Sequence, residues 1–128
     1  MAIAFSTRVD PDEIQRRSVL LLDDSEQVLK ILSRHLRRRF DAIFTATDST
    51  NAEKILEEQE ISTLVCDHGV ASPSSVQLIT KWRKRYKSIK RAVILTGADV
   101  SAIKPTSSVD AILYKNLPLR NILTEVAK

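Results

Sequence analysis

Short apolar runs recur along the chain and predict the strands of a sheet. The first, SVLLL at 18–22, has no alternation of apolar and polar positions, as expected for a strand that is covered on both faces. The third is rich in β-branched residues, which favour strands. The five predicted strands lie at 18–22, 41–46, 62–66, 91–96 and 109–114.

Between these runs, apolar residues recur every three or four positions, which predicts helices. Ser25 stands where an N-cap is expected, so we predict a first helix from about 25 to 39. The apolar residues that follow at helical spacing are Val28, Leu29, Ile31, Leu32 and Leu36. Further helices are predicted at 49–59, 74–87 and 119–126.

The alternation of strands and helices predicts an α/β fold with a mostly parallel sheet. Right-handed crossovers would then place helices on both faces of that sheet. The segment between the fourth and fifth strands has little apolar periodicity, so we expect only a short or irregular fourth helix near 98–103. Residues 1–16 are polar enough to form an N-terminal arm, and 17–128 would form one domain.

Length and composition exclude some classes of protein. The longest apolar runs have four or five residues, far from the roughly 20 that a membrane-spanning helix needs, and no signal peptide is visible. The single cysteine, Cys66, allows no internal disulfide, which fits a cytoplasmic location. We expect this thiol to behave as a small hydrophobe in the core.

The net charge of +4 comes largely from two basic runs, RHLRRRF at 34–40 and KWRKRYK at 81–87. They could form a patch that binds nucleic acid, or they could be two solvated helix faces. The spacing of Ile79, Trp82 and Tyr86 favours one helix face that is turned toward the core. We therefore expect no direct binding of nucleic acid and no membrane contact.

Charged and hydroxyl side chains follow four of the predicted strands. Asp23 and Asp24 follow the first, Asp67 the third, Thr96 ends the fourth and Lys115 follows the fifth. Ligands of parallel α/β sheets bind at the carboxyl ends of the strands, so these side chains should meet at one edge. Carboxylates that are held together need a cation, and oxygen ligands suit Mg²⁺. The lysine and the hydroxyl suit a phosphoryl group, and a carboxylate can accept one as an aspartyl phosphate.

The order of these motifs resembles the receiver domain of two-component response regulators. The resemblance rests on LLLDD (20–24), LVCD (64–67), VILTG (93–97) and YK (114–115), and it covers roughly 17–128. It implies a flavodoxin-like three-layer αβα sandwich with a five-stranded parallel sheet in the order 2-1-3-4-5.

The resemblance also implies a role for each residue of the site. Asp67 would accept the phosphoryl group and contact Mg²⁺, which Asp24 would bind directly and Asp23 would support, partly through water. The backbone carbonyl of Gly69 would be another metal ligand. The remaining two roles belong to Thr96 and Lys115. Thr96 would hydrogen-bond a phosphoryl oxygen, and Lys115 would pair with Asp67 and then with the phosphoryl group.

A sensor histidine kinase would donate the phosphoryl group, and an output domain or effector protein would read the result. A homodimer is possible. The domain would not be a classical enzyme, although it would assist its own phosphorylation and dephosphorylation. The chain ends soon after its last helix begins, so we expect the N-terminal part of a longer protein.

Some positions depart from the family pattern. Val70-Ala71 stands where Met-Pro is usual, and Ile112 replaces the aromatic residue of the switch. Lys115 is followed by Asn116 rather than proline, so we predict a trans peptide bond there.

These departures leave two rival functions. One is a pseudo-receiver that binds partners without phosphorylation. The other is a phosphohydrolase with an aspartate nucleophile, but Gly69 stands where its second aspartate is expected. His68 either tunes the access of water to an acyl phosphate or is a plain loop residue.

Overall fold

The sheet is fully parallel and has the predicted strand order. The computed structural model describes residues 17–70, 74–97, 103 and 106–128. Within these ranges one five-stranded sheet has the order β2-β1-β3-β4-β5, and all neighbouring strands run parallel. The strands are β1 (Ser18–Leu22), β2 (Ala42–Ala46), β3 (Thr63–Asp67), β4 (Arg91–Thr96) and β5 (Ala111–Tyr114). The flavodoxin-like topology is confirmed.

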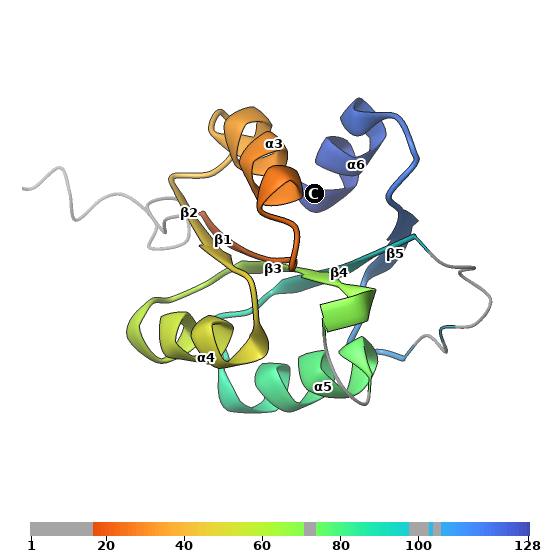
Figure 1. The fold of residues 1–128 in the computed structure, drawn as a ribbon. Helices are drawn as coiled ribbons and strands as arrows, with labels where there is room; N and C mark the ends of the chain where they lie inside the picture. Colours follow the sequence, from red (N-terminus) through yellow and green to blue (C-terminus); the bar gives the residue numbers. More distant parts are fainter. Residues whose placement is uncertain (1–16, 71–73, 98–102, 104–105) are drawn as a thin grey trace, which may run out of the picture.

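Helices cover both faces of this sheet. Helices α3 and α6 lie on one face, and α4 and α5 lie on the other, which gives the three layers (Figure 1). A single 3₁₀ turn, η1, follows β3 directly. The helices are α3 (Glu26–Leu36), α4 (Ser49–Glu58), α5 (Ser75–Arg85) and α6 (Leu119–Val126), and η1 spans His68–Val70.

Two apolar layers hold the sandwich together, one on each face of the sheet. Successive side chains of a strand point to opposite faces. Leu20 and Leu22 of β1 therefore join the cluster beneath α4 and α5, whereas Val19 and Leu21 join the cluster beneath α3 and α6. All four side chains are at most 1% exposed, so the absence of alternation in SVLLL reflects burial on both faces.

The first helix is shorter than predicted, and one of its apolar residues is exposed. It ends at Leu36, and Arg37 is its C-cap. Ile31 does not face the core, because it is 43% exposed. At 3.6 residues per turn, Ile31 points roughly 160° away from Leu29, which is buried. Ser25 is the N-cap, as predicted, and its side chain accepts a hydrogen bond from Val28 N.

The apolar stripe of the second basic run faces the core, as its spacing predicts. Ile79 and Trp82 are both fully buried, and Tyr86 packs partly buried against the same cluster. Trp82 also donates its Nε1 hydrogen to Glu53 Oε2 at 2.9 Å. These rings are therefore not available to stack with nucleic-acid bases.

Two predictions fall outside the part of the chain that the structure describes. They are the arm at 1–16 and most of the short fourth helix near 98–103. Ile103 is described, and it is buried in the cluster beneath α4 and α5. None of the described helices combines the length and the apolar character needed to cross a bilayer.

Candidate functional site

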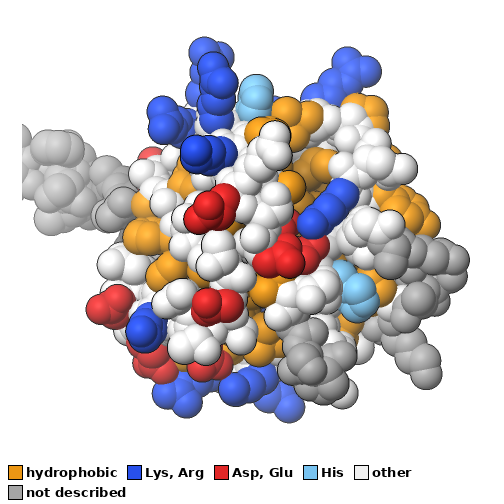
Figure 2. All heavy atoms as spheres, viewed as in Figure 1, with side chains coloured by type: hydrophobic (Ala, Val, Ile, Leu, Met, Phe, Trp, Pro, Cys, Tyr) orange, Lys and Arg blue, Asp and Glu red, His pale blue; other side chains and the backbone are white. Residues whose placement is uncertain are grey.

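The carboxyl ends of β1 and β3 bring three carboxylates together. The two strands are neighbours, with Leu22 beside Cys66, so the acids that follow in sequence share one edge of the sheet. One oxygen each from Asp23, Asp24 and Asp67 lies within 4.8 Å of the others. Acidic side chains form a compact group there beside a single Lys or Arg side chain (Figure 2). The predicted convergence of these acids is confirmed.

Lys115 supplies positive charge to this acidic group. Its Nζ lies 2.6 Å from Asp67 Oδ1 and 3.0 Å from Asp23 Oδ2. Its backbone N–H donates to Thr96 O at 2.9 Å, which fixes the start of the loop after β5 against the end of β4. Burial lowers the pKa of Lys115, but the hydrogen bond to Asp67 and the nearby Asp23 outweigh it and raise this pKa. Lys115 therefore carries its charge at neutral pH.

Asp23 is held by the backbone through one oxygen and faces the Lys115 ammonium with the other. Its carboxylate is 3% exposed, and Oδ1 accepts a hydrogen bond from Ser25 N at 2.9 Å. Oδ2 is buried and has no hydrogen-bond partner among the described residues. The close partner of Oδ2 in the described part of the chain is the Lys115 ammonium, at 3.0 Å.

The acidic group fits a hard divalent cation. Asp23 Oδ2 is buried and has the Lys115 ammonium as its close partner in the described part of the chain, and two other carboxylates lie beside it. Three carboxylates with one ammonium leave excess negative charge, which an ion with oxygen ligands can offset. Asp24 is exposed, whereas Asp23 and Asp67 are buried, so a cation could be held at the surface and approached from solvent.

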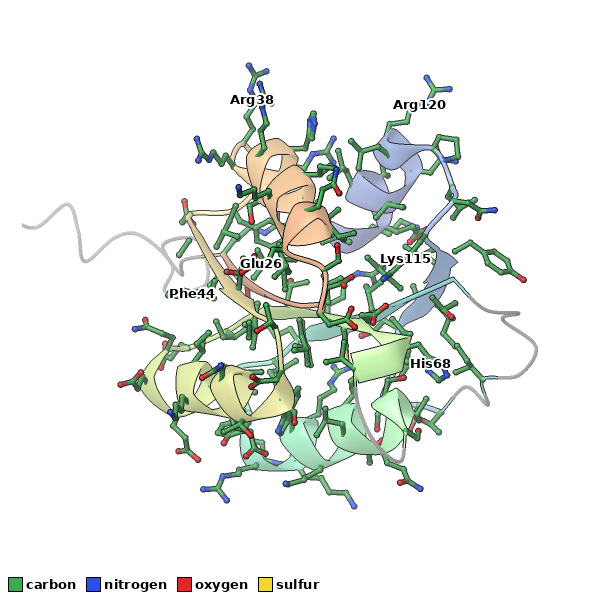
Figure 3. The ribbon with its side chains drawn as sticks, viewed as in Figure 1. Glu26, Arg38, Phe44, His68, Lys115 and Arg120 are labelled. Carbon is green, nitrogen blue, oxygen red and sulfur yellow. The ribbon has the colours of Figure 1, made fainter. Side chains whose placement is uncertain are left out.

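The 3₁₀ turn η1, which follows β3, also borders the site. A Cβ atom at Gly69 would lie 3.4 Å from Asp67 Oδ2, so the backbone passes close to that oxygen. The Nδ1 atom of His68 lies 2.8 Å from Oγ of the fully buried Ser75. Figure 3 shows His68 and Lys115 on opposite sides of the strand ends. The hydrogen bond ties the turn to the first residue of α5.

Cys66 belongs to the core and not to the chemistry of the site. The side chain is fully buried. Burial, together with the charges of Asp67 and Asp23, raises the pKa of its thiol to about 12. It is therefore a neutral thiol at neutral pH, as predicted for a small apolar residue.

Sequence reasoning found most of the site but missed three contacts. Thr96 is 1% exposed at the end of β4, where it was predicted. The pairing of Lys115 with Asp23 was not foreseen, nor was the hydrogen bond of His68 with Ser75. The Ser25 N–H to Asp23 bond had a signal, because aspartate often accepts from the backbone two residues on. The role of the Gly69 carbonyl stays a prediction.

Comparison with known proteins identifies the fold. No protein-family model matches the chain, and no curated protein matches it by sequence. Solved structures do match over most of its length. A CheY-like response regulator receiver domain from Methanospirillum hungatei has a TM-score of 0.75 at 16% identity, over 88% of this chain and 91% of that one.

Two further solved structures carry ligands. A response regulator from Burkholderia pseudomallei, with a phosphorylated aspartic acid, a calcium ion and citrate, has a TM-score of 0.68 at 22% identity over 88% of this chain. This chain covers 66% of that regulator. The response regulator TrrA from Thermotoga maritima, in complex with Mg²⁺-BeF, has a TM-score of 0.72 at 18% identity, over 86% of this chain and 96% of that one. The chain therefore has the fold of response regulator receiver domains.

Proposed function

We propose that the chain is a phosphorylation-switched receiver domain and that Asp67 accepts the phosphoryl group. The observation that carries this proposal is the joint placement of three carboxylates within 4.8 Å and of Lys115 Nζ at 2.6 Å from Asp67 Oδ1. Lys115 forms an ion pair with one oxygen of Asp67, Oδ1. The other oxygen, Oδ2, faces the backbone of Gly69, where no Cβ crowds it.

Each residue then has a defined task. Asp67 Oδ2 attacks the phosphorus atom of a phosphohistidine in a sensor histidine kinase, and the histidine nitrogen leaves. The Lys115 ammonium stays near Asp67 Oδ1 and offsets the negative charge that the phosphoryl group brings. Thr96, which is buried at the end of β4, would hydrogen-bond a phosphoryl oxygen.

A divalent cation, Mg²⁺ by preference, would be held by Asp23, Asp24, Asp67 and the backbone carbonyl of Gly69. When bound, it supplies the positive charge that brings an anionic phosphoryl donor to an acidic site. The solved relatives that carry calcium or Mg²⁺-BeF support this assignment.

The phosphoryl group would change the surface that partner proteins contact. It adds a strong negative charge next to η1 and to the end of β4, and such a charge can shift a two-state equilibrium of the neighbouring loops. An output domain or effector protein would read this change, in a cytoplasmic setting. The domain assists its own phosphorylation and dephosphorylation and is otherwise not an enzyme.

The test is intact-protein mass spectrometry after incubation with acetyl phosphate, with and without Mg²⁺, on the natural chain and on Asp67→Asn. We expect one added phosphoryl group that depends on Mg²⁺ and is absent in the variant. The pseudo-receiver function would be favoured if no adduct forms and beryllofluoride also fails to bind. One observation favours the pseudo-receiver function. Ile112, which packs against the core, stands in place of the switch aromatic.

A further inference from the structure

The two basic runs of the sequence have opposite electrostatic surroundings in the fold. Three cations of α5 are neutralised by acids from other elements. The pairs are Lys81–Glu53, Arg83–Asp110 and Arg85–Glu57, at 3.2, 2.9 and 2.7 Å. By contrast, Lys30, Arg34 and Arg37 of α3 and its C-cap have no ion pair and no side-chain hydrogen bond within the described ranges. Lys and Arg side chains also project above α3 in the surface view (Figure 2).

These unpaired cations line a groove. Lys30, Arg34 and Arg37 are spaced by four and three residues, so they share one face of α3. That face forms one wall of a groove of about 790 Å³. The groove lies between α3 and the end of the edge strand β2, together with the segment that follows this strand. The opposite wall carries hydroxyl and amide groups from Thr45, Thr47 and Asn51, and buried Leu29 and Ala46 also line the groove.

The groove continues along the same side of the edge strand. A second hollow of about 310 Å³ shares Ser33 and Arg37 with the first and extends to Ile43 and Asp41. From Glu26 to Arg37, eleven residues of helix at about 1.5 Å each give a groove roughly 16 Å long. An extended polypeptide of about five residues has the same length.

We infer that this groove, between α3 and β2, binds an extended acidic segment of a partner protein. Lys30 and Arg34 are about 6 Å apart along the helix axis, and Arg37 follows about 4.5 Å further on. Alternate side chains of an extended segment repeat at about 6.6 Å, so carboxylates at alternate positions can each reach a cation. Arginine binds carboxylates through two parallel hydrogen bonds, which gives such a groove its specificity.

The positions of the acids in the groove favour a peptide over nucleic acid. Glu26 lies at one end of the groove and Asp41 at the other. A nucleic-acid backbone carries charge along its whole length and would meet repulsion at both ends, whereas a peptide can confine its acids to the middle. Phe40 is the one aromatic residue in the lining of the two hollows, and it is 6% exposed, so no ring is available for base stacking.

The helix dipole does not account for the whole cation set. Arg34 and Arg37 lie in or beside the last turn of α3, where positive charge opposes the negative end of the dipole. Lys30 lies two turns from the end of the helix and gains little from it. The three cations Lys30, Arg34 and Arg37 are exposed on one face of α3. Helix α5 also has a dipole, yet acids from other elements form ion pairs with three of its cations.

Fluorescence anisotropy with a short labelled peptide tests this inference. The peptide carries glutamates at alternate positions, and a second peptide has glutamine in their place. We expect the glutamate peptide to bind, with an affinity that falls as salt is added. Arg34→Gln/Arg37→Gln should weaken its binding by about 3- to 10-fold, the range for two exposed charge contacts.

The control variant is Lys84→Gln/Lys87→Gln, which removes the same charge from exposed positions at the end of α5. It should change the affinity less than about twofold. Equal losses in both double variants, or equal binding of the glutamine peptide, would overturn the inference, because only net charge or non-specific contact would then be at work. Tighter binding of an oligothymidylate of equal charge would overturn it in favour of nucleic acid.

A second variant covers the case in which the arginine variant folds poorly. Lys30→Gln changes one exposed side chain in the middle of the helix and should weaken the glutamate peptide by about two- to threefold. Thermal unfolding of each variant shows whether a loss of binding reflects a loss of fold. None of these measurements depends on phosphorylation, so the inference and the proposed receiver function can fail separately.

Discussion

Lys115→Met tests the electrostatic balance of the site most directly. The substitution keeps a long unbranched side chain, with sulfur in place of one methylene, and removes the ammonium group. That group lies 2.6 Å from one carboxylate and 3.0 Å from another, and these carboxylates belong to Asp67 and Asp23. Without it, no described cation forms an ion pair with either acid.

The size of the effect follows from burial and distance. Asp23 and Asp67 are 3% and 7% exposed, and their oxygens lie within 4.8 Å. Removing one partner of a buried ion pair costs about 3–5 kcal/mol, because it leaves an uncompensated buried charge. Solvent reaches the 30% of the Lys115 side chain that is exposed and screens part of this. We therefore expect Lys115→Met to lower the free energy of unfolding by about 2–3 kcal/mol.

Urea unfolding followed by tryptophan fluorescence measures this loss. Trp82 is the only tryptophan and is fully buried, so its emission reports on the fold. Lys84→Met, on the exposed end of α5, is the matched control and should cost less than about 0.5 kcal/mol. Added Mg²⁺ should restore more stability to Lys115→Met than it adds to the natural chain, because the cation replaces the missing charge.

Two results would refute this reasoning. One is a loss no larger than that of the Lys84→Met control, which would mean that the ion pairs of Lys115 do not stabilise the buried acids at the strength that their burial indicates. The other is an equal gain from Mg²⁺ in the variant and in the natural chain. In that case the cation would act away from the carboxylates that Lys115 contacts.

Three further predictions concern the pH dependence of the Lys115 ion pairs, the Cys66 thiol and the N-cap of α4. The raised pKa of Lys115 means that the stability from its ion pairs is complete below its ordinary pKa of 10.5 and is lost as pH rises through the higher pKa of the folded state. The stability difference between the natural chain and Lys115→Met should therefore persist at pH 10.5 and shrink only above it, as urea unfolding across this range would show. The Cys66 thiol is buried and its pKa is raised to about 12. A thiol-reactive disulfide should therefore modify it at about pH 8 only when urea unfolds the chain. Rapid modification of the folded chain would contradict this. Asp48 is the N-cap of α4 and accepts a hydrogen bond from Asn51 N at 2.8 Å, so Asp48→Ala should cost about 1 kcal/mol in urea unfolding; a cost near zero would show that the cap is unimportant.

The strands and the site acids could be predicted from sequence because their signals are local. A strand that is buried on both faces needs a continuous apolar run, and RAVILT at 91–96 coincides with β4 (Arg91–Thr96). In a parallel sheet the ends of all strands meet at one edge, so position after a strand was enough to bring Asp23, Asp67 and Lys115 together. Helix ends were less well defined. The exposure of Ile31 was not predicted either, since a count of apolar residues does not give the direction in which each side chain points.

The partners of the charged side chains could not be predicted in this way. The sequence shows two basic runs that look alike, and only the packing of α5 against α4 places Glu53 and Glu57 beside its cations. No described acid is placed in this way against Arg34 or Arg37 of α3. The hydrogen bond between His68 and Ser75 depends in the same way on how η1 meets α5.

The sequence alone therefore determined the α/β fold, the positions of its strands and the set of residues at the strand ends, because periodicity and order along the chain decide these. Only the tertiary structure decided that Lys115 contacts Asp23 as well as Asp67, that one oxygen of Asp23 is buried without a hydrogen bond among the described residues, and that one basic run is neutralised while the other lines a groove. The physical reason is that charge pairing acts over a few ångströms between side chains from different elements. Those distances are set when the helices pack on the sheet.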